Sequence, residues 1–352
     1  MNAFRLVASL LVLTGATLAA SEPIKAISGD DLREPHGLAF DAHGAMYGVE
    51  SVRTNRVFKL QGNHLEFISG VRWDSAPKGQ EPPAPAKALD LAPALYHGPA
   101  DIAVAPDGSL YVVDTFQHRL VRLDPETHAV TAFAGTGQAG FAGDGGRADR
   151  ARFNILSGGV IDPTGKFLLL ADLGNHRIRR IDLATQVVTT FAGNGQPGFP
   201  QDGADALQTS MDYVRSVCVG PDGTVYALLI RKDALIAIKD GKVEVVVNKA
   251  GLTGPATDGP AADARLNKPK GLTMDAKGNV LILDTENHCL RLFDPTKKTI
   301  RTIAGNGRAG SALGKDWAST QLNRPHGARV GPDGRLYVAD SENNRILVGP
   351  AP

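Results

Sequence analysis

A unit of strand, polar corner and strand recurs along this chain of 352 residues. Its best-formed copy runs from Phe167 to Ile181, with an apolar strand, the polar corner Asp172 to His176, and a second strand. Close copies occupy residues 110–123, 280–293 and 336–348, and a looser copy occupies 45–60. One such unit can bury its apolar face only against a neighbouring unit, so this repetition constrains the fold more than any other feature.

Six glycines place the repeats in register. They are Gly44, Gly108, Gly165, Gly223, Gly278 and Gly334, and neighbours lie 55 to 64 residues apart. Three of them follow a Pro-Asp pair, a pattern typical of hairpin turns because Pro fixes φ at one turn position and Gly accepts positive φ at another. Each interval has room for four strands, which in the second unit are 101–105, 109–114, 119–123 and 130–134. Six four-stranded units in register predict an all-β fold, a six-bladed β-propeller.

We expect the two ends of the chain to share one blade. The sixth unit has three strands before Pro352, and residues 23–28 resemble the fourth strand of the other units. An N-terminal strand that closes the last blade would hide two sheet edges. The expected blades cover about 30–70, 98–135, 155–193, 213–248, 268–305 and 324–350, with strand 23–28 added to the last.

Residues 1–20 have the pattern of a signal peptide: Arg5, an apolar run from Leu6 to Leu18, and small residues before Ser21. We therefore expect residues 21–352 to be exported, to the periplasm or outside the cell. No stretch is long enough to predict a membrane span. Removal of residues 1–20 would take away Arg5 and lower the formal net charge from +1 to zero. A protein without net charge is a poor candidate for nucleic-acid binding, which needs a basic face. A monomer without nucleic-acid partners is expected.

Three smaller features accompany the repeats. Cys218 and Cys289 are interpreted as unpaired, buried thiols. Residues 71–97 hold five prolines and are interpreted as either a lid or a tolerated loop. An apolar residue twelve positions before each glycine is predicted to plug a connection onto the blade below. These plugs are Leu32, Tyr96, Phe153, Met211, Leu266 and Leu322.

The polar corners carry a family resemblance. Asp172 with Asn175-His176-Arg177, and the corners that begin at Asp114, Asp284 and Asp340, resemble NHL repeats, whereas the fourth unit departs at 229–234. The resemblance covers nearly all of residues 23–350 and implies a six-bladed propeller that binds through its faces, without fixing a ligand. We expect Asp172 to accept backbone N–H groups of the turn and to pair with Arg177, and His176 to be exposed or to cap the turn.

One position of each unit is expected to face the central channel, eight residues before the hairpin glycine. The six residues are His36, Ala100, Ser157, Arg215, Lys270 and His326. Arg215 and Lys270 belong to neighbouring blades, and so do His326 and His36 once the ring closes. This ring is predicted to be cationic on one side, imidazole-bearing on the other, and without a carboxylate.

Besides a solvated channel with no ligand, two interpretations of the ring stay open. Arg215 and Lys270 offer a fork and a point charge to a carboxylate or phosphate, and His36 and His326 add donors. Alternatively, the two histidines bind a divalent metal, zinc or calcium, as a resemblance to amidating-lyase and gluconolactonase-type propellers implies. The lyase pattern needs three histidines, and two protein ligands are few for zinc. Two fixed positive charges without a ring carboxylate attract an anion and repel a metal dication, so electrostatics favours the anion.

No nucleophile, base and orienting group can be named, so catalytic residues stay unassigned. The favoured interpretation is a non-enzymatic module that binds a small anionic ligand or a protein partner through His36, Arg215, Lys270 and His326. The alternative is a lyase or hydrolase acting on a small anionic substrate, with the histidines as acid–base groups or metal ligands and the two cations as clamps.

Overall fold

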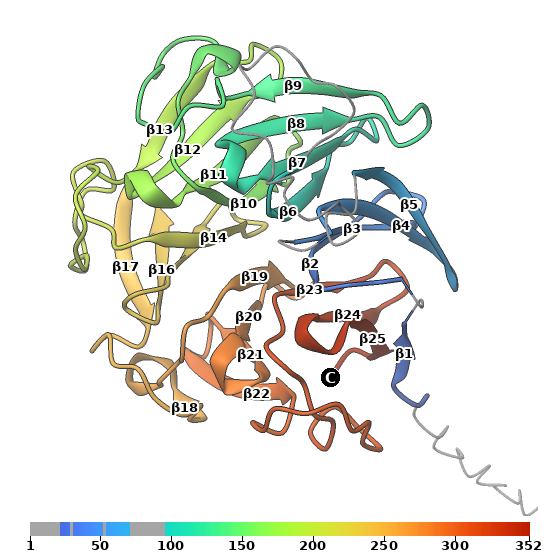
Figure 1. Ribbon diagram of the computed structural model, residues 1–352. Coiled ribbons are helices and arrows are strands. Elements are labelled where there is room, and N and C mark those ends of the chain that lie inside the picture. The colour runs from blue at the N-terminus through green and yellow to red at the C-terminus, as the bar shows by residue number, and fades with distance from the viewer. Residues whose placement is uncertain (1–21, 29–30, 52–53, 71–95) are drawn as a thin grey trace, which may run out of the picture.

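Six sheets surround a central axis in the computed structural model, which describes residues 22–28, 31–51, 54–70 and 96–352 (Figure 1). The expected signal peptide and nearly all of the 71–97 insertion lie outside the described residues. Within them the only helices are six short 3-10 turns, and no helix is long and apolar enough to cross a membrane. The prediction of an all-β, six-bladed propeller is confirmed.

The strands of each blade follow one another from the channel outward. Blade 1 holds β2 (Pro35–Phe40), β3 (Met46–Glu50), β4 (Arg56–Gln61) and β5 (His64–Gly70), and blade 2 holds β6 (Pro99–Val104), β7 (Leu110–Asp114), β8 (Arg119–Leu123) and β9 (Val130–Ala134). Blade 3 holds β10 (Leu156–Ile161), β11 (Phe167–Asp172), β12 (Arg177–Asp182) and β13 (Val188–Ala192), and blade 4 holds β14 (Val214–Val219), β15 (Val225–Leu229), β16 (Ala234–Lys239) and β17 (Lys242–Val247). Blade 5 holds β19 (Gly271–Met274), β20 (Val280–Asp284), β21 (Cys289–Asp294), β22 (Thr299–Ala304) and the added β18 (Gly259–Pro260). Blade 6 holds β23 (Gly327–Val330), β24 (Arg335–Asp340), β25 (Arg345–Pro350) and β1 (Lys25–Ile27).

The closure of the ring uses the N-terminal strand. β1 pairs antiparallel with β25, with Lys25 opposite Val348 and Ile27 opposite Ile346. Figure 1 shows β1 beside β25 at the outer edge of blade 6. The expected sharing of the last blade is therefore confirmed, and β1 is tied to β25 by backbone hydrogen bonds.

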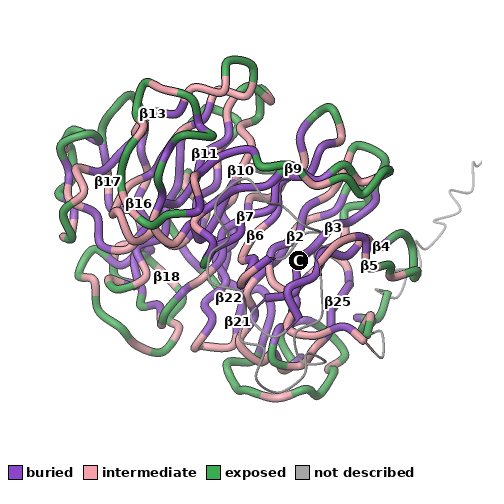
Figure 2. The backbone as a smooth tube through the Cα atoms, turned by 45° about the horizontal axis from the view of Figure 1, so that its top comes forward, coloured by how far each residue is buried: buried purple, intermediate pink, exposed green. Residues whose placement is uncertain are grey.

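The apolar core is divided among six clusters, one at each interface between neighbouring blades. All six predicted plugs are buried, with exposed fractions of 0 to 1%. Full burial of such a side chain contributes about 1.5–3 kcal/mol. Cys218 and Cys289 are free and buried, as expected. Figure 2 shows the buried chain inside the blades and the exposed chain in the connections between them.

The outer edges of blades 3, 4 and 5 are covered by the Asp-Gly connections. Gly259 pairs with Ile300 of blade 5, and the carboxylate of Asp258 accepts the N–H of Thr302 at 2.9 Å. Asp202 accepts the N–H of Val245 in blade 4 at 2.7 Å. The aspartates thus satisfy edge donors that would otherwise be open to another strand.

The polar corners form 3-10 turns, but their bonding differs from the expectation. Asp172 accepts a backbone N–H from Asn154 at 2.8 Å, in the connection that leads into the blade, and from the turn it accepts the side-chain N–H of Asn175 at 2.8 Å. Its ion-pair partner is Arg179, at 3.3 Å, and not Arg177. Arg177 instead donates to backbone carbonyls and lies over the Phe141 ring at 3.8 Å.

The reason for this exchange is the second arginine of blade 3. Arg179 lies two residues further along the same strand, and its fully buried guanidinium also reaches Asp144 at 2.6 Å. Blades 2 and 6 have apolar residues at the position of Arg179, and there the expected pairs form, Arg119 with Asp114 and Arg345 with Asp340.

The last residue of each corner joins neighbouring blades. It has positive φ, between 47° and 53°, and its side chain accepts a backbone N–H from the connection that leads into the next blade. The acceptors are Asn55, His118, His176, Asp233, His288 and Asn344, and the donors, in the same order, are Gly98, Ile155, Tyr213, Lys268, Arg324 and Glu34. We call these six bonds the corner latches.

Candidate functional site at the central channel

The innermost strands of all six blades converge on the channel (Figure 1). The side chains of the predicted ring start where the connections lead into these strands, and we call this side of the propeller the ring face. His36, Arg215, Lys270 and His326 line one cavity together with Ala100 and Ser157, so the four predicted ligand-binding residues do meet. They come from blades 1, 4, 5 and 6.

The channel is narrow because the blades meet backbone to backbone. A Cβ atom on Gly327 would lie 2.0 Å from the carbonyl oxygen of His36, and one on Gly271 would lie 2.4 Å from that of His326. A Cβ on Gly37 would collide with Asp101. Only glycine permits these approaches. The close contact leaves a cavity of about 20 Å³, which is room for about one water molecule.

His36 and His326 stack face to face across the junction of blades 1 and 6. Their ring centroids are 4.1 Å apart with an interplanar angle of 10°. Burial, then the charges of Arg215 and Lys270, lowers the pKa of His36 to about 3. Burial and the neighbouring His36 and Lys270 lower the pKa of His326 well below its usual range. Both imidazoles are therefore neutral at physiological pH.

Lys270 completes this side of the ring. Its Nζ lies 3.2 Å from Nε2 of His326, so the ammonium donates to the neutral imidazole. Burial, then repulsion from Arg324 and Arg215, lowers the pKa of Lys270 to about 8. Lys270 therefore stays largely protonated at neutral pH.

The histidine pair does not fit a divalent metal. A metal binds an imidazole nitrogen in the plane of its ring, and the planes of His36 and His326 are nearly parallel, so they share no point at bonding distance. The Nε2 lone pair of His326 is already engaged by Lys270. Among the described residues, no group of three or more His, Cys, Asp or Glu side chains could hold a metal.

Arg215 is anchored by the neighbouring blade. Its NH1 donates to the carbonyl of Ser157 at 2.5 Å, and the Ser157 hydroxyl donates back to the Arg215 carbonyl at 2.9 Å. Burial lowers the pKa of Arg215, while Asp101 acts in the opposite direction. The reciprocal bonds fix one edge of the guanidinium at the cavity wall.

The expectation of a ring without a carboxylate is wrong. Asp101 lines the cavity and accepts the N–H groups of Ile102 at 2.9 Å and Gly159 at 3.2 Å. Burial raises the pKa of Asp101, and the charges of Arg329 and Arg215 oppose that rise. Its side chain fills the space that Gly37 leaves open in blade 1.

Arg329 is the second residue that the sequence analysis missed. It lines the same cavity and donates to the carbonyls of Ala328 at 3.0 Å and Leu272 at 3.3 Å. Both missed residues had a signal in the repeat register. Seven residues before the hairpin glycine, five units have Gly or Ser and only blade 2 has Asp101. Five residues before the hairpin glycine, the other five units have an uncharged residue and only blade 6 has a charged one, Arg329.

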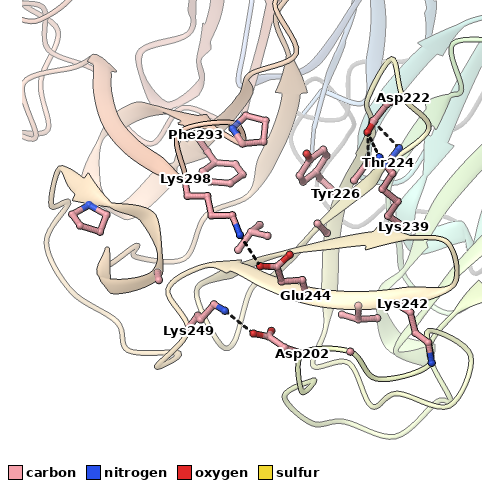
Figure 3. A pocket seen from close by; sticks show the side chains of 17 residues that line it. Asp202, Asp222, Thr224, Tyr226, Lys239, Lys242, Glu244, Lys249, Phe293 and Lys298 are labelled. Carbon is pink, nitrogen blue, oxygen red and sulfur yellow. Dashed lines mark hydrogen bonds and ion pairs between the residues drawn. The ribbon is translucent and has the colours of Figure 1, made fainter.

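A larger groove lies between blades 4 and 5 (Figure 3). It has a volume of about 720 Å³, and Tyr226 and Phe293 are among its lining residues. Three lysines on it are held in ion pairs: Lys239 with Asp222 at 2.6 Å, Lys249 with Asp202 at 2.5 Å, and Lys298 with Glu244 at 3.4 Å. Its charges are thus largely neutralised within the groove, in contrast to the channel.

Comparison with known proteins agrees with the repeat pattern. The family model for the NHL repeat matches residues 266–293 and 322–348. The chain is 28% identical over 294 residues to NHL repeat-containing protein 2 of Gallus gallus, a match that covers 72% of this chain and 39% of that protein. The chain thus spans well under half the length of this relative.

Two solved structures share the architecture. An auxiliary nutrient binding protein from Bacteroides thetaiotaomicron superposes with a TM-score of 0.64 at 15% identity, covering 90% of this chain and 69% of that one. A gluconolactonase from Xanthomonas campestris superposes with a TM-score of 0.60 at 12% identity, covering 96% and 94%. At such identities the likeness shows the fold alone. The repeats, the corners and the ring of six blades together define an NHL-repeat β-propeller. The chain is a six-bladed β-propeller whose units resemble the NHL repeat, and the family model matches the units of blades 5 and 6.

Proposed function

We propose that this protein is an exported binding module that holds a small anionic ligand, or an anionic group of a protein partner, over the channel mouth. The observation that carries the proposal is the meeting of His36, Arg215, Lys270 and His326, from four blades, around one cavity. Cations and imidazole donors suit a carboxylate or phosphate.

The small size of the cavity supports binding over catalysis. Sites that enclose a small-molecule substrate typically measure about 300–1,000 Å³, whereas this cavity measures about 20 Å³. A carboxylate or phosphate would therefore rest on the mouth, with the rest of its carrier lying on the ring face. None of the described residues forms a nucleophile–base–orienter arrangement at the cavity.

A thermal melting series tests the proposal. Phosphate and acetate are added at constant ionic strength, with methanesulfonate as the balancing anion. We expect a saturable rise in Tm that is lost in Lys270→Met. Lys239→Met, at an exposed, ion-paired lysine outside the channel, is the matched control and keeps the rise. No rise in the parent protein with either anion would refute the proposal.

The alternative function is a lyase or hydrolase acting on a small anionic substrate. One observation favours it: the neutral His326 lies beside Lys270, whose lowered pKa of about 8 suits proton transfer. Stoichiometric zinc in the purified protein, lost in His326→Ala, would favour the enzyme despite the poor metal geometry. Export is tested by the N-terminal sequence of the protein from the periplasmic and extracellular fractions.

A further inference from the structure

We propose that the cavity inside the ring is a halide site, which holds one chloride ion between Arg215, Lys270 and the stacked histidines. The inference rests on the proposed function only in that both use the ring. The ligand of the mouth is an oxyanion on a larger carrier, whereas the occupant of the cavity is monatomic.

Size selects the occupant. The cavity of about 20 Å³ has room for about one water molecule or an ion of similar size. A phosphate or acetate has several heavy atoms and does not fit a space of this volume. Among common biological anions, chloride is small enough to fit.

Charge selects an anion. Three cationic side chains line the cavity, Arg215, Lys270 and Arg329, against one carboxylate, Asp101. Both histidines are neutral and leave this excess unchanged. Buried like charges are costly unless an opposite charge compensates them, and a chloride ion would supply it. A cation would be repelled.

Hydrogen-bond donors remain available for the ion. The Nδ1 atom of His36 is buried and has no hydrogen-bond partner among the described residues, which is rare for a buried nitrogen. Within the described part of the chain, the Arg215 side chain donates one hydrogen bond, to the Ser157 carbonyl, and so uses one of its five N–H donors. Each carboxylate oxygen of Asp101 accepts one backbone N–H, from Ile102 and from Gly159.

The repulsion among the ring groups points the same way. Burial is the largest cause of the lowered pKa values of His36 and Lys270, and positive charges add to it: Arg215 and Lys270 act on His36, and Arg324 and Arg215 act on Lys270. These mutual effects show a positive potential inside the cavity. An anion at its centre would lower that potential and relieve all of them.

The experiment measures chloride-specific stabilisation. Tm is recorded while sodium chloride replaces sodium methanesulfonate at constant ionic strength, without phosphate. We expect a saturable rise of about 2–4 °C at saturation. The rise should vanish in Lys270→Met and persist in Lys239→Met. Equal Tm values in the two salts would overturn the inference.

A crystal grown or soaked in sodium bromide locates the ion without any variant. We expect one anomalous peak on the channel axis, within contact distance of Lys270 and His36. A channel that holds only water would overturn the inference. The two proposals separate cleanly: a response to chloride without one to phosphate supports the halide site and refutes the oxyanion at the mouth, and the opposite result refutes the halide site alone.

Discussion

The imidazole of His288 accepts the backbone N–H of Arg324 at its Nδ1 atom, over 3.2 Å, and so ties the corner of blade 5 to the start of blade 6. This latch explains why the corner ends in His, Asn or Asp. The residue must adopt positive φ and also present an acceptor to the next blade. In blade 6, Asn344 does the same for the N–H of Glu34 at 2.9 Å.

Substitutions at this latch should separate the two requirements. His288→Ala removes the acceptor, and we expect a loss of about 1–2 kcal/mol in the free energy of unfolding. His288→Asn keeps a side-chain acceptor and tolerates positive φ, so it should stay within about 0.5 kcal/mol of the parent protein. Urea denaturation measures both. Equal losses in the two variants would show that the hydrogen bond contributes nothing.

Stability should fall as the pH falls below neutrality. The pKa of His36 is lowered to about 3 in the folded protein, against about 6.5 in the unfolded chain, so the unfolded chain binds more protons in between. The stabilisation is therefore complete above about pH 6.5 and is lost toward pH 3, at up to about 1.4 kcal/mol per pH unit. Burial lowers the pKa of His118 and His288 too, in the same direction.

Urea denaturation at pH 7, 6 and 5 measures this slope. His36→Gln, which cannot titrate, should flatten it, whereas His43→Gln, at an exposed histidine, should not. The same slope in all three proteins would contradict the assignment of a neutral buried His36.

Close backbone contact at the channel predicts intolerance of a single methyl group. In Gly327→Ala the new Cβ would lie 2.0 Å from the His36 carbonyl oxygen, and we expect a loss of about 3 kcal/mol. Gly146→Ala is the matched control, since its Cβ would meet only one atom at 3.4 Å and its φ is not positive. That control should change stability by less than about 0.5 kcal/mol. Thermal denaturation of both variants decides, and a tolerated Gly327→Ala would mean that the blades are further apart.

The two arginines of β12 should differ in importance. Arg179→Met leaves the buried carboxylate of Asp172 without its cation, with an expected cost of about 3 kcal/mol. Arg177→Met loses only carbonyl bonds and the contact with Phe141, with an expected cost of about 1 kcal/mol. Chemical denaturation compares them. A larger loss in Arg177→Met would restore the pairing expected from the corner motif alone.

The repeat register predicted the architecture because it is a property of spacing. The six hairpin glycines placed the plugs and the four ring residues of the cavity by counting along the chain. The closure by β1 followed from the missing fourth strand of the last unit and from the likeness of residues 23–28 to such a strand. Position alone could not choose between Arg177 and Arg179, which lie on the same face of one strand and compete for Asp172. That choice depends on the tertiary approach of Asp144.

The interior of the channel was the hardest part to predict. Asp101 and Arg329 reach the cavity from positions that are small or neutral in the other blades, so a search confined to the position eight residues before each glycine did not include them. The place of Asp101 depends on Gly37, whose missing side chain makes room for it. The available signal for Asp101 was the position seven residues before each hairpin glycine, which is Gly or Ser in the other five blades.

The pH dependence of anion stabilisation follows from Lys270, whose pKa is lowered to about 8 by burial and by the charges of Arg324 and Arg215. The ammonium is present below that value and is lost above it. We therefore expect the rise in Tm with phosphate to be large at pH 7 and at least halved at pH 9.5. Glu286 and Glu342 act on the pKa of Lys270 in the opposite direction. An unchanged rise at pH 9.5 would exclude Lys270 as a ligand.

The most direct test of the central claim is a titration of the protein with phosphate, followed by NMR of the imidazole nitrogens. If the ring recognises an anion, the signals of His36 and His326 shift together and saturate, while those of the exposed His43 and His64 stay in place. Unmoved signals of the stacked pair, or equal shifts in all four histidines, would contradict an anion site at the channel mouth.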